Sequence, residues 1–434
     1  MLAACLLNSR SRSRSREASV LLSSVTPCGT SVASPTKGCL LPPYVMFRGM
    51  WWRCSLLIIA TAVAIALLPR LPMPDGRLVT TFPKDRLKML PEFPVNLSGW
   101  NVVNDRLLQT KRIFEGLMDG SESAVAAADG HFAFMDKDGK YHVARPQKDG
   151  SFALDNPKGR HVGLSGRPLG FLYDKQGRLV VCDSSAGLLR FDPKTKITEV
   201  LSNALPDGTP LRYVDDVTEG SDGSLYFTSA CEQPVAFNGA SGFFDTMRGA
   251  QMDLAYGTPT GRLLRWDPAT RATEELASGL FFANGVALAP DDSFVLVAET
   301  FSARVMRVWL RGERAGQSDV FVDQLPGFPD GVSRREGGGF WIALVNPPSV
   351  VAWVTPYRAA RSAIAHTIDL IQPLVKRWGA VAHVGHDGKK LTLMLDRLGE
   401  RVQSIPAVHQ HGRRLIFGNL QGNYASYLDL EPGE

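Results

Sequence analysis

A short turn followed by a strong apolar strand recurs six times in the body of this chain, and no other feature constrains the fold as much. The turn residues are Gly130, Gly177, Gly223, Asp292, Gly338 and Gly412, separated by 47, 46, 69, 46 and 74 residues. Short apolar runs broken by Gly, Asp and Pro fill the intervals, which is typical of β-strands and turns. A period near 46 residues, with about four strands per unit, is typical of a propeller blade. The repeat predicts an all-β fold, a six-bladed β-propeller of four-stranded blades, with a β-sandwich of coincidental spacing as the alternative.

The positions eight residues before these turns form a second pattern. They are Glu122, Leu169, Asp215, Asn284, Asp330 and Ser404. Equivalent positions at one end of the inner strands of a propeller converge on its axis. Four of the six carry hard oxygen donors, with no thiolate or imidazole among them, and such a set favours Ca²⁺ over Zn²⁺. Taken singly, these residues also fit ordinary turns, since Asn-Gly and Asp-Gly are turn dipeptides. The shared offset favours a metal site made of Glu122, Asp215, Asn284 and Asp330.

The formal net charge of +5 is concentrated near the N-terminus. Residues 1–53 hold seven Lys and Arg but one acid, and the rest of the chain has 41 basic and 42 acidic side chains. The body is therefore near neutral, and its charge does not indicate a nucleic-acid partner. Only Cys182 and Cys231 lie in the body, and no CxxC pair occurs. This excludes a disulfide-dense scaffold and a Cys-based zinc site, while pairing of the two in an oxidising compartment stays open.

An uncharged apolar run, Cys54–Leu68, lies near the N-terminus and follows two tryptophans. With Met50–Trp52 it approaches the roughly 20 residues that span a bilayer. A signal anchor is the interpretation we favour, with a cleaved signal peptide or a translation start at Met46 or Met50 as alternatives. The expected segments are a basic, Ser/Arg-rich disordered region at 1–49, a transmembrane helix at 50–69, a linker at 70–105 and the propeller at 106–432.

The anchor sets the expected location. Basic residues flank it on both sides, so the charge rule does not decide the orientation alone. We expect a single-pass membrane protein of the endoplasmic reticulum or endomembrane system with its propeller luminal or extracellular, or a secreted or vacuolar protein after cleavage. Asn96 begins an Asn-Leu-Ser sequon and is a glycosylation site if the body is luminal.

The two long intervals of the repeat contain inserts, residues 231–258 and 356–380. In the second, apolar residues fall on one helical face, and they are Ile364, Ile368, Ile371, Val375 and Trp378. This pattern predicts a helix that forms a lid or contacts the membrane, or one that packs on the propeller, with an interruption at Pro373.

Several phrases in the body carry a family resemblance. They are GRPLG (166–170), YVDDVTEGSDGSLYFTS (213–229), FANGVALAPDDSFVLVAET (282–300) and LPGFPDGV (325–332). From about residue 110 to 430 the chain resembles the strictosidine synthase-like proteins, especially the adipocyte plasma membrane-associated type. Paraoxonase and gluconolactonase/regucalcin belong to the wider set. The resemblance implies a six-bladed propeller with Ca²⁺ in its central channel, held by Glu122, Asp215, Asn284 and Asp330.

Two departures from the family pattern bear on the chemistry. Strictosidine synthase has a catalytic Glu in the segment leading into blade six, whereas residues 402–411 here, VQSIPAVHQH, hold no acid. Paraoxonase has a proposed catalytic His in its second-blade loop, and Leu169 stands near that position here. His409 and His411 can substitute, or they are surface histidines. The resemblance also makes Asp330 the candidate nucleophile or base.

The leading hypothesis is a membrane-anchored, calcium-dependent hydrolase of the arylesterase or lactonase type, acting on a small-molecule ester or lactone. The cation would polarise the carbonyl oxygen, and Asp330 and His409 are the candidate catalytic residues. A non-catalytic, calcium-stabilised propeller that binds a partner or lipid is the alternative. A condensing enzyme of the strictosidine synthase type is disfavoured by the missing acid.

Overall fold

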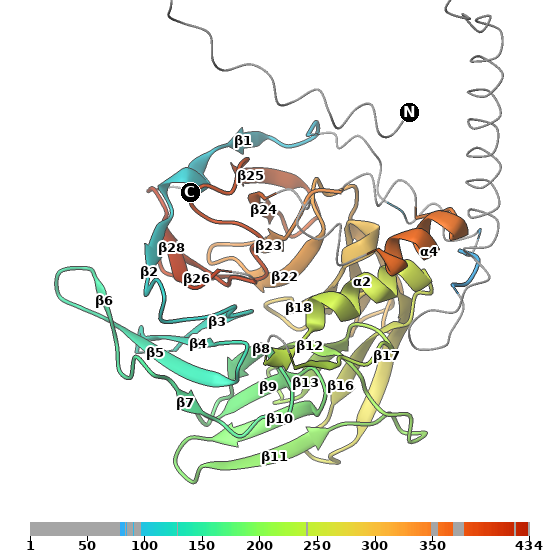
Figure 1. Cartoon of the computed structure of the whole chain (residues 1–434), viewed down its shortest axis with the longest axis horizontal. Coiled ribbons are helices and arrows are strands. Elements are labelled where there is room, and N and C mark those ends of the chain that lie inside the picture. Colours follow the sequence, from blue (N-terminus) through green and yellow to red (C-terminus); the bar gives the residue numbers. More distant parts are fainter. Residues whose placement is uncertain are drawn as a thin grey trace, which may run out of the picture. The chain divides into compact units, whose positions relative to one another are not determined.

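The computed structural model describes residues 79–82, 84, 90, 97–127, 129–239, 242–348, 355–367, 377–420 and 422–432. Within these ranges the strands form six sheets of four or five strands arranged around a common centre, together with one two-stranded hairpin (Figure 1). The predicted all-β, six-bladed propeller is confirmed, and the sandwich alternative is wrong. The transmembrane helix predicted at 50–69 and the sequon residue Asn96 lie outside the described residues. No helix within the described ranges is long and apolar enough to cross a membrane.

Each blade begins at an inner strand and continues outward along the chain. Blade one contains β3 (Ala124–Ala126), β4 (Phe132–Met135), β5 (Lys140–Pro146) and β6 (Phe152–Leu154), and β7 (Arg160–His161) pairs with β5. Blade two contains β8 (Pro168–Tyr173), β9 (Leu179–Asp183), β10 (Gly187–Asp192) and β11 (Ile197–Ser202). Blade three contains β12 (Val214–Glu219), β13 (Leu225–Ser229), β16 (Gly261–Trp266) and β17 (Thr273–Leu280).

The second half of the propeller repeats this order. Blade four contains β18 (Ala283–Leu288), β19 (Phe294–Glu299), β20 (Arg304–Trp309) and β21 (Ser318–Val322), with the short helix η4 (Thr300–Ser302) between β19 and β20. Blade five contains β22 (Pro329–Arg334), β23 (Phe340–Leu344), β24 (Gly379–Val384) and β25 (Lys390–Asp396). Blade six contains β26 (Val408–His411), β27 (Arg414–Phe417) and β28 (Ala425–Asp429).

The chain closes the propeller with strands that precede blade one. β2 (Lys111–Ile113) is the outer strand of blade six and pairs antiparallel with β28. β1 (Val102–Asn104), which lies in the region predicted as linker, adds a parallel fifth strand to blade five beside β25. The short helix η3 (Arg106–Gln109) joins them. The two added strands cover the backbone edges of blades five and six, which would otherwise be open to pairing with other chains.

The second strand of each blade is largely buried because neighbouring blades cover both its faces, and in blade four the first strand is buried as well. Every residue of β18 and β19 is buried, so these strands read as nearly continuous apolar runs rather than as alternating ones. Between blades four and five the rings of Phe294, Phe321 and Phe340 pack together. Burial on both faces explains why the strong strands of the repeat were the clearest signal in the sequence.

Both inserts carry helices that lie side by side (Figure 1). The insert between β13 and β16 contains the hairpin β14 (Phe237–Asn238) and β15 (Phe243–Phe244), followed by α2 (Thr246–Tyr256). The insert between β23 and β24 contains α4 (Arg358–His366). The helix predicted over 356–380 is present as α4, which includes Ile364, whereas Trp378 packs in the core of blades four and five. The predicted face residues Ile368, Ile371 and Val375 lie outside the described residues.

Cys182 and Cys231 are both buried and free. Cys182 belongs to the core between blades two and three, whereas Cys231 belongs to an aromatic cluster beneath the first insert. The disulfide left open by the sequence is therefore absent. Burial raises the pKa of each thiol well above its usual range, so both remain protonated at neutral pH.

Candidate functional site

A small cavity lies where the six inner strands converge. Its volume is about 20 Å³, which is room for one water molecule or one small ion but not for an organic ester. Every blade contributes to its wall, and the lining residues are Glu122, Ser123, Gly170, Asp215, Asp216, Asn284, Asp330, Gly331, Val332, Pro406, Ala407, Val408 and His409. All four predicted metal ligands, which include the predicted catalytic Asp330, and the predicted catalytic His409 therefore line one cavity.

A shared irregularity of the inner strands places these residues. The register of pairing between the first two strands shifts at residues 215–216, 284–285 and 330–331, and at 169–170 in blade two. Residues inside such bulges leave the ladder, so their side chains can turn toward the axis instead of alternating between the sheet faces. In each blade, the residue that lies two positions before the first residue regularly paired with the second strand therefore occupies an equivalent place. We call this set the axial ring, and its members are Glu122, Leu169, Asp215, Asn284, Asp330 and Pro406.

The sixth member of the ring differs from the sequence prediction. Counting eight residues back from Gly412 gives Ser404, but the ring position is Pro406, because Val408 pairs with Phe417 as Ala124 pairs with Phe134 in blade one. The hairpin of blade six is shorter than the others. His411 pairs directly with Arg414, which leaves two residues in the turn. Gly412 therefore follows the ring position by six residues instead of eight. The prediction of Ser404 is wrong for this reason.

The residue two positions before the ring residue has a left-handed backbone in four blades. These residues are Gly120, Tyr213, Phe282 and Ser404, with φ values of 60°, 49°, 66° and 47°. A left-handed conformation costs a residue with a side chain of order 1–3 kcal/mol, and such strain clusters at functional sites. The repetition of the same kink in equivalent places indicates that it directs each incoming loop into the ring.

The ring acids are buried without enough donors. Burial, followed by the charges of Glu122 and Asp216, raises the pKa of Asp215 well above its usual range. Burial, followed by the charges of Glu122, Asp215 and Asp216, does the same to the pKa of Asp330, although the Asn284 amide donates to that carboxylate. Burial also raises the pKa of Glu122. Carboxylates in this arrangement take up protons or a cation, because they repel one another and have lost their water.

Arg167 is a charged partner that sequence reasoning missed. Its guanidinium Nη2 lies 3.1 Å from Glu122 Oε2 and 3.4 Å from the Gly120 carbonyl oxygen, and it opposes the rise in the Glu122 pKa. Arg167 is buried two residues before Leu169, the one apolar side chain besides Pro406 in the ring. The sequence did contain one signal. In GRPLG the ring position is Leu169, which has no oxygen donor, and a basic residue, Arg167, stands two positions before it.

Asp216 has a structural role beside the ring. Its Oδ1 accepts from the Val217 backbone N–H, and its Oδ2 accepts from the Val286 N–H in blade four, both at 2.9 Å. Nearby, the Thr228 hydroxyl donates to the Asn284 carbonyl oxygen at 2.8 Å. These bonds tie blade three to blade four. Burial raises the pKa of Asp216 to about 7, against the lowering effect of the two backbone donors.

His409 lines the cavity and His411 does not. Burial lowers the pKa of His409 to about 4, so its imidazole is neutral at neutral pH. His409 Nε2 lies 3.5 Å from the Ser123 hydroxyl oxygen. His411 borders a separate crevice of about 520 Å³ between blades one and six. The other residues that blade six contributes to the axial cavity are Pro406, Ala407 and Val408, so no acid from this blade reaches it.

The donor chemistry of the cavity fits a hard cation. Carboxylate and amide oxygens are the ligands of Ca²⁺, and the surplus of buried negative charge favours a divalent ion. The cavity size also suits a single ion. Among the described residues, however, no three His, Cys, Asp or Glu side chains are grouped closely enough to hold a metal as they stand. The four predicted ligands share a cavity, and they do not form a finished coordination shell.

Three comparisons place the chain among known proteins. Residues 215–313 match the family model described as strictosidine synthase. The chain is 30% identical over 362 residues to the adipocyte plasma membrane-associated protein of Salmo salar, which covers 78% of this chain and 82% of that one. Among solved structures, a gluconolactonase from Xanthomonas campestris superposes with a TM-score of 0.51 at 18% identity, covering 75% of this chain and 91% of that one.

A second solved structure, the calcium-binding protein regucalcin from Agrobacterium tumefaciens, superposes with a TM-score of 0.50 at 15% identity. It covers 76% of this chain and 96% of the regucalcin chain. At these identities the two solved structures establish a common fold, and they say nothing by themselves about activity.

Proposed function

The chain belongs to the strictosidine synthase-like family that includes the adipocyte plasma membrane-associated proteins, and from that premise we propose that it is a calcium-dependent hydrolase of small-molecule esters or lactones. One observation carries the proposal. Four oxygen donors from four blades line a single ion-sized cavity on the axis, and burial has raised the pKa values of its carboxylates. A gluconolactonase and a calcium-binding regucalcin share the fold, which supports the same reading.

In this proposal Glu122, Asp215, Asn284 and Asp330 hold the cation. A bound calcium ion would polarise the carbonyl oxygen of the substrate and keep the ring acids ionised. Asp330 either adds to the carbonyl carbon and displaces the alkoxide, leaving an acyl-aspartate that water hydrolyses, or takes the proton of a water that adds to this carbon as the C–O bond to the alkoxide breaks. Arg167 holds Glu122 in place through their buried ion pair.

His409 supplies a second proton acceptor in the same cavity. Its imidazole is neutral because it is buried, so a ring nitrogen is free to take a proton, with the Ser123 hydroxyl as its neighbour. Blade six offers no carboxylate to this cavity, and a condensing reaction that relies on a blade-six acid is therefore not proposed.

One observation favours the non-catalytic alternative, a calcium-stabilised propeller that binds a partner or lipid. The axial cavity has room for an ion but not for an ester, and the insert helices pack over an aromatic cluster beside the ring. Catalysis therefore requires movement of this covering, whereas a structural cation does not.

The experiment compares purified full-length protein, in detergent, with two variants. Asp330→Asn removes a ring carboxylate, and Asp292→Asn removes a blade-turn carboxylate as the matched control. Hydrolysis of phenyl acetate and of a δ-lactone is measured with calcium and with EDTA. We expect turnover that EDTA abolishes, that Asp330→Asn lowers by about 100-fold or more, and that Asp292→Asn keeps. Bound calcium without any turnover would support the non-catalytic alternative.

We also propose that residues 50–69 anchor the protein in the endoplasmic reticulum or endomembrane system, with the propeller luminal and Asn96 glycosylated. The name of the Salmo salar relative, a plasma membrane-associated protein, supports a membrane location. Carbonate extraction of cell membranes and the gel shift after glycosidase treatment test the two parts. Release of the protein by carbonate would contradict the anchor. If neither glycosidase treatment nor Asn96→Gln changed the mobility of the band, the glycosylated luminal site would be contradicted.

A further inference from the structure

A short segment that precedes the propeller is packed onto both insert helices. Val79 is fully buried and joins Ala255, Tyr256 and Ala365 in one apolar cluster. Phe82 is also buried, and its ring lies 5.7 Å from that of Phe281. The segment Val79–Phe82 thus contacts α2, α4 and the start of blade four together.

Hydrogen bonds also join the segment, α2 and α4 to one another. The Thr80 hydroxyl donates to the Tyr256 carbonyl oxygen at the end of α2, at 3.0 Å. From α4, Arg361 donates through Nη1 to that same carbonyl oxygen at 3.2 Å, and through Nη2 to the Thr80 carbonyl oxygen. Arg358 Nε donates to the Val79 carbonyl oxygen at 2.6 Å. Arg361 is therefore the centre at which the segment, α2 and α4 meet.

The end of α2 is shaped to receive this guanidinium. Arg361 is buried, and Gly257, which caps α2 in a left-handed conformation, lies directly against it. A Cβ at position 257 would overlap the Arg361 guanidinium. Glycine thus serves twice here, because it adopts the positive φ of the helix end and leaves the space for the arginine.

The assembled segment and helices cover the ring end of the channel. Phe82 belongs to a cluster that contains Leu169, a ring residue, and Tyr213, which lies two residues before the ring residue Asp215. The Tyr213 hydroxyl donates to the Thr246 carbonyl oxygen in the first turn of α2, at 2.9 Å. Phe82 and α2 therefore lie against residues of the ring and of the loops that lead into it.

We propose that Val79–Phe82 is a strap that binds in the groove between α2 and α4 and holds them closed over the ring end of the axial channel. Release of the strap removes the Thr80 carbonyl partner of Arg361, the Val79 carbonyl partner of Arg358 and the apolar contacts of Val79 with both helices, so α2 and α4 loosen as one unit. The consequence of the strap for the ring rests on the proposed function. The inference deepens that function by naming what controls access to the ring. The strap follows the predicted anchor by ten residues, a span of at most about 36 Å.

The test uses full-length protein in detergent and changes the strap in both directions. Val79→Ser with Phe82→Ser weakens the docking, and Val103→Ser, at an exposed apolar position, is the matched control. Thr80→Cys with Thr258→Cys allows a disulfide lock, because the two hydroxyl oxygens lie 3.0 Å apart. Hydrogen exchange is followed in residues 246–256 and 358–366, and calcium release to a chelator is followed by stopped flow.

We expect the double Ser variant to raise amide exchange in both helices by about tenfold or more while β12 and β18 keep their protection. The same variant should release calcium faster, and the oxidised lock should slow both processes until it is reduced. Unchanged exchange in α2 and α4 in the Ser variant, or in the lock before and after reduction, would overturn the proposal. If the wild type binds no calcium, the proposed function fails, and hydrogen exchange alone still decides the strap.

Discussion

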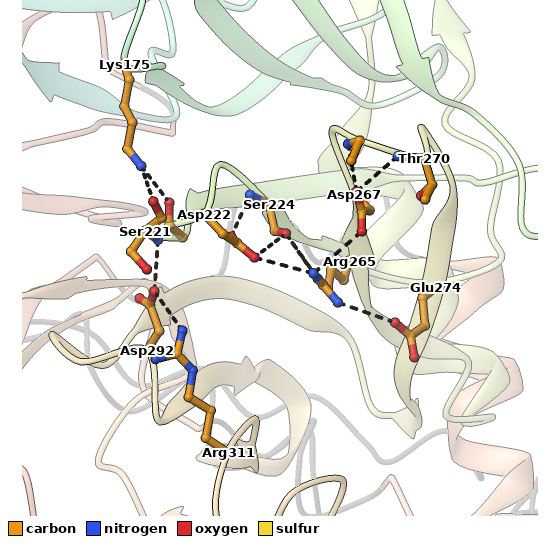
Figure 2. A network of polar contacts seen from close by, with 12 residues as sticks. Lys175, Ser221, Asp222, Ser224, Arg265, Asp267, Thr270, Glu274, Asp292 and Arg311 are labelled. Atoms are coloured by element: carbon orange, nitrogen blue, oxygen red, sulfur yellow. Dashed lines mark hydrogen bonds and ion pairs between the residues drawn. The ribbon is translucent and has the colours of Figure 1, made fainter.

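The inner strands of this propeller carry acids at both ends, and the hydrogen-bond donors and positive charges around these acids differ between the two ends. At the turn end of blades two to four, each acid has donors within reach, and Figure 2 shows Arg265 lying among Asp222, Asp267 and Glu274. At the axial ring, three carboxylates are buried, and the Arg167 guanidinium hydrogen-bonds to one of them, that of Glu122. The turn end is complete as a folded protein surface, whereas the ring end is short of positive charge.

The pKa values of the two groups express the difference. At Asp222 burial alone would raise the pKa, but hydrogen bonds from Ser224 and the Arg265 charge bring it below the usual range. At Asp215 burial and the neighbouring acids raise the pKa well above that range, and Arg167 offsets only part of the rise. Acids that only stabilise the fold are given donors, as in Figure 2, where Asp292 accepts from the Ser221 N–H and pairs with Arg311. The ring acids stand at equivalent ends of three blades and have too few donors for their buried charge, so they are placed for a ligand.

The largest effect is expected from removing Arg167, the buried cation that pairs with the ring residue Glu122. Arg167→Met leaves Glu122 buried without its partner, and breaking a buried pair in this way costs about 3–5 kcal/mol. Calcium should reduce the loss, since it supplies the missing positive charge. Urea unfolding in EDTA and in calcium measures both values, and an equal loss in the two conditions would contradict a cation site beside Glu122.

The next effect is the removal of the metal from the unchanged protein. A ligand at 100 times its dissociation constant stabilises the folded state by about 2.7 kcal/mol, which corresponds to a shift in the melting temperature of about 4 °C for a domain of this size. We expect EDTA to lower the melting temperature by that amount and calcium to restore it. Magnesium at the same concentration is the control ion, and equal protection by it would argue against a site that prefers calcium.

A smaller effect is expected from crowding the ring. In Gly285→Ala the new Cβ would collide with the Asp330 carbonyl oxygen and the Val332 nitrogen, and overpacking of this kind costs about 1–3 kcal/mol. Gly239→Ala is the matched control, because nothing lies within 4 Å of its Cβ. Chemical unfolding compares the two. If Gly285→Ala were as stable as Gly239→Ala, the close approach of blades four and five at the ring would be wrong.

The smallest effect is expected at the turn end. Arg265→Met removes exposed ion pairs to Asp222 and Glu274, worth roughly 0.2–1 kcal/mol. Because the pKa of folded Asp222 is lowered, its contribution is present above the unfolded pKa and is lost as the pH falls through the folded value. The difference between wild type and variant should therefore vanish in acid. A difference that grows in acid, measured by unfolding at several pH values, would contradict the charge pairing.

Much of this molecule could be predicted from the repeat alone. The offset from turn to ring located Glu122, Asp215, Asn284 and Asp330 correctly in the axial cavity, because the hairpins of blades one to five are of nearly equal length. The turn between the first two strands has five residues in blades one, two, three and five, and six in blade four. The offset failed for blade six, where a two-residue turn moved the ring position from Ser404 to Pro406. The offset from turn to ring is constant only where the hairpin between the first two strands has the same length. The length of each turn could not be predicted from the sequence.

Two features needed coordinates because they depend on contacts between distant residues. Arg167 reaches Glu122 across 45 positions, and no local pattern marks it as the charge partner of the ring. The strap was hidden inside a predicted linker, since Val79–Phe82 has no periodicity of its own and is ordered by Tyr256 and Arg361. The same holds for Trp378, which was predicted on the helical face of the second insert and packs in the propeller core instead.

The central claim is that the ring acids gather to bind a cation and the turn acids do not. Equilibrium dialysis of calcium against full-length wild type, Asp215→Asn and Asp292→Asn measures this directly. The account predicts about one bound calcium per chain in the wild type and in Asp292→Asn, and loss of that ion in Asp215→Asn. No bound calcium in the wild type, or the same binding in Asp215→Asn as in Asp292→Asn, would contradict it.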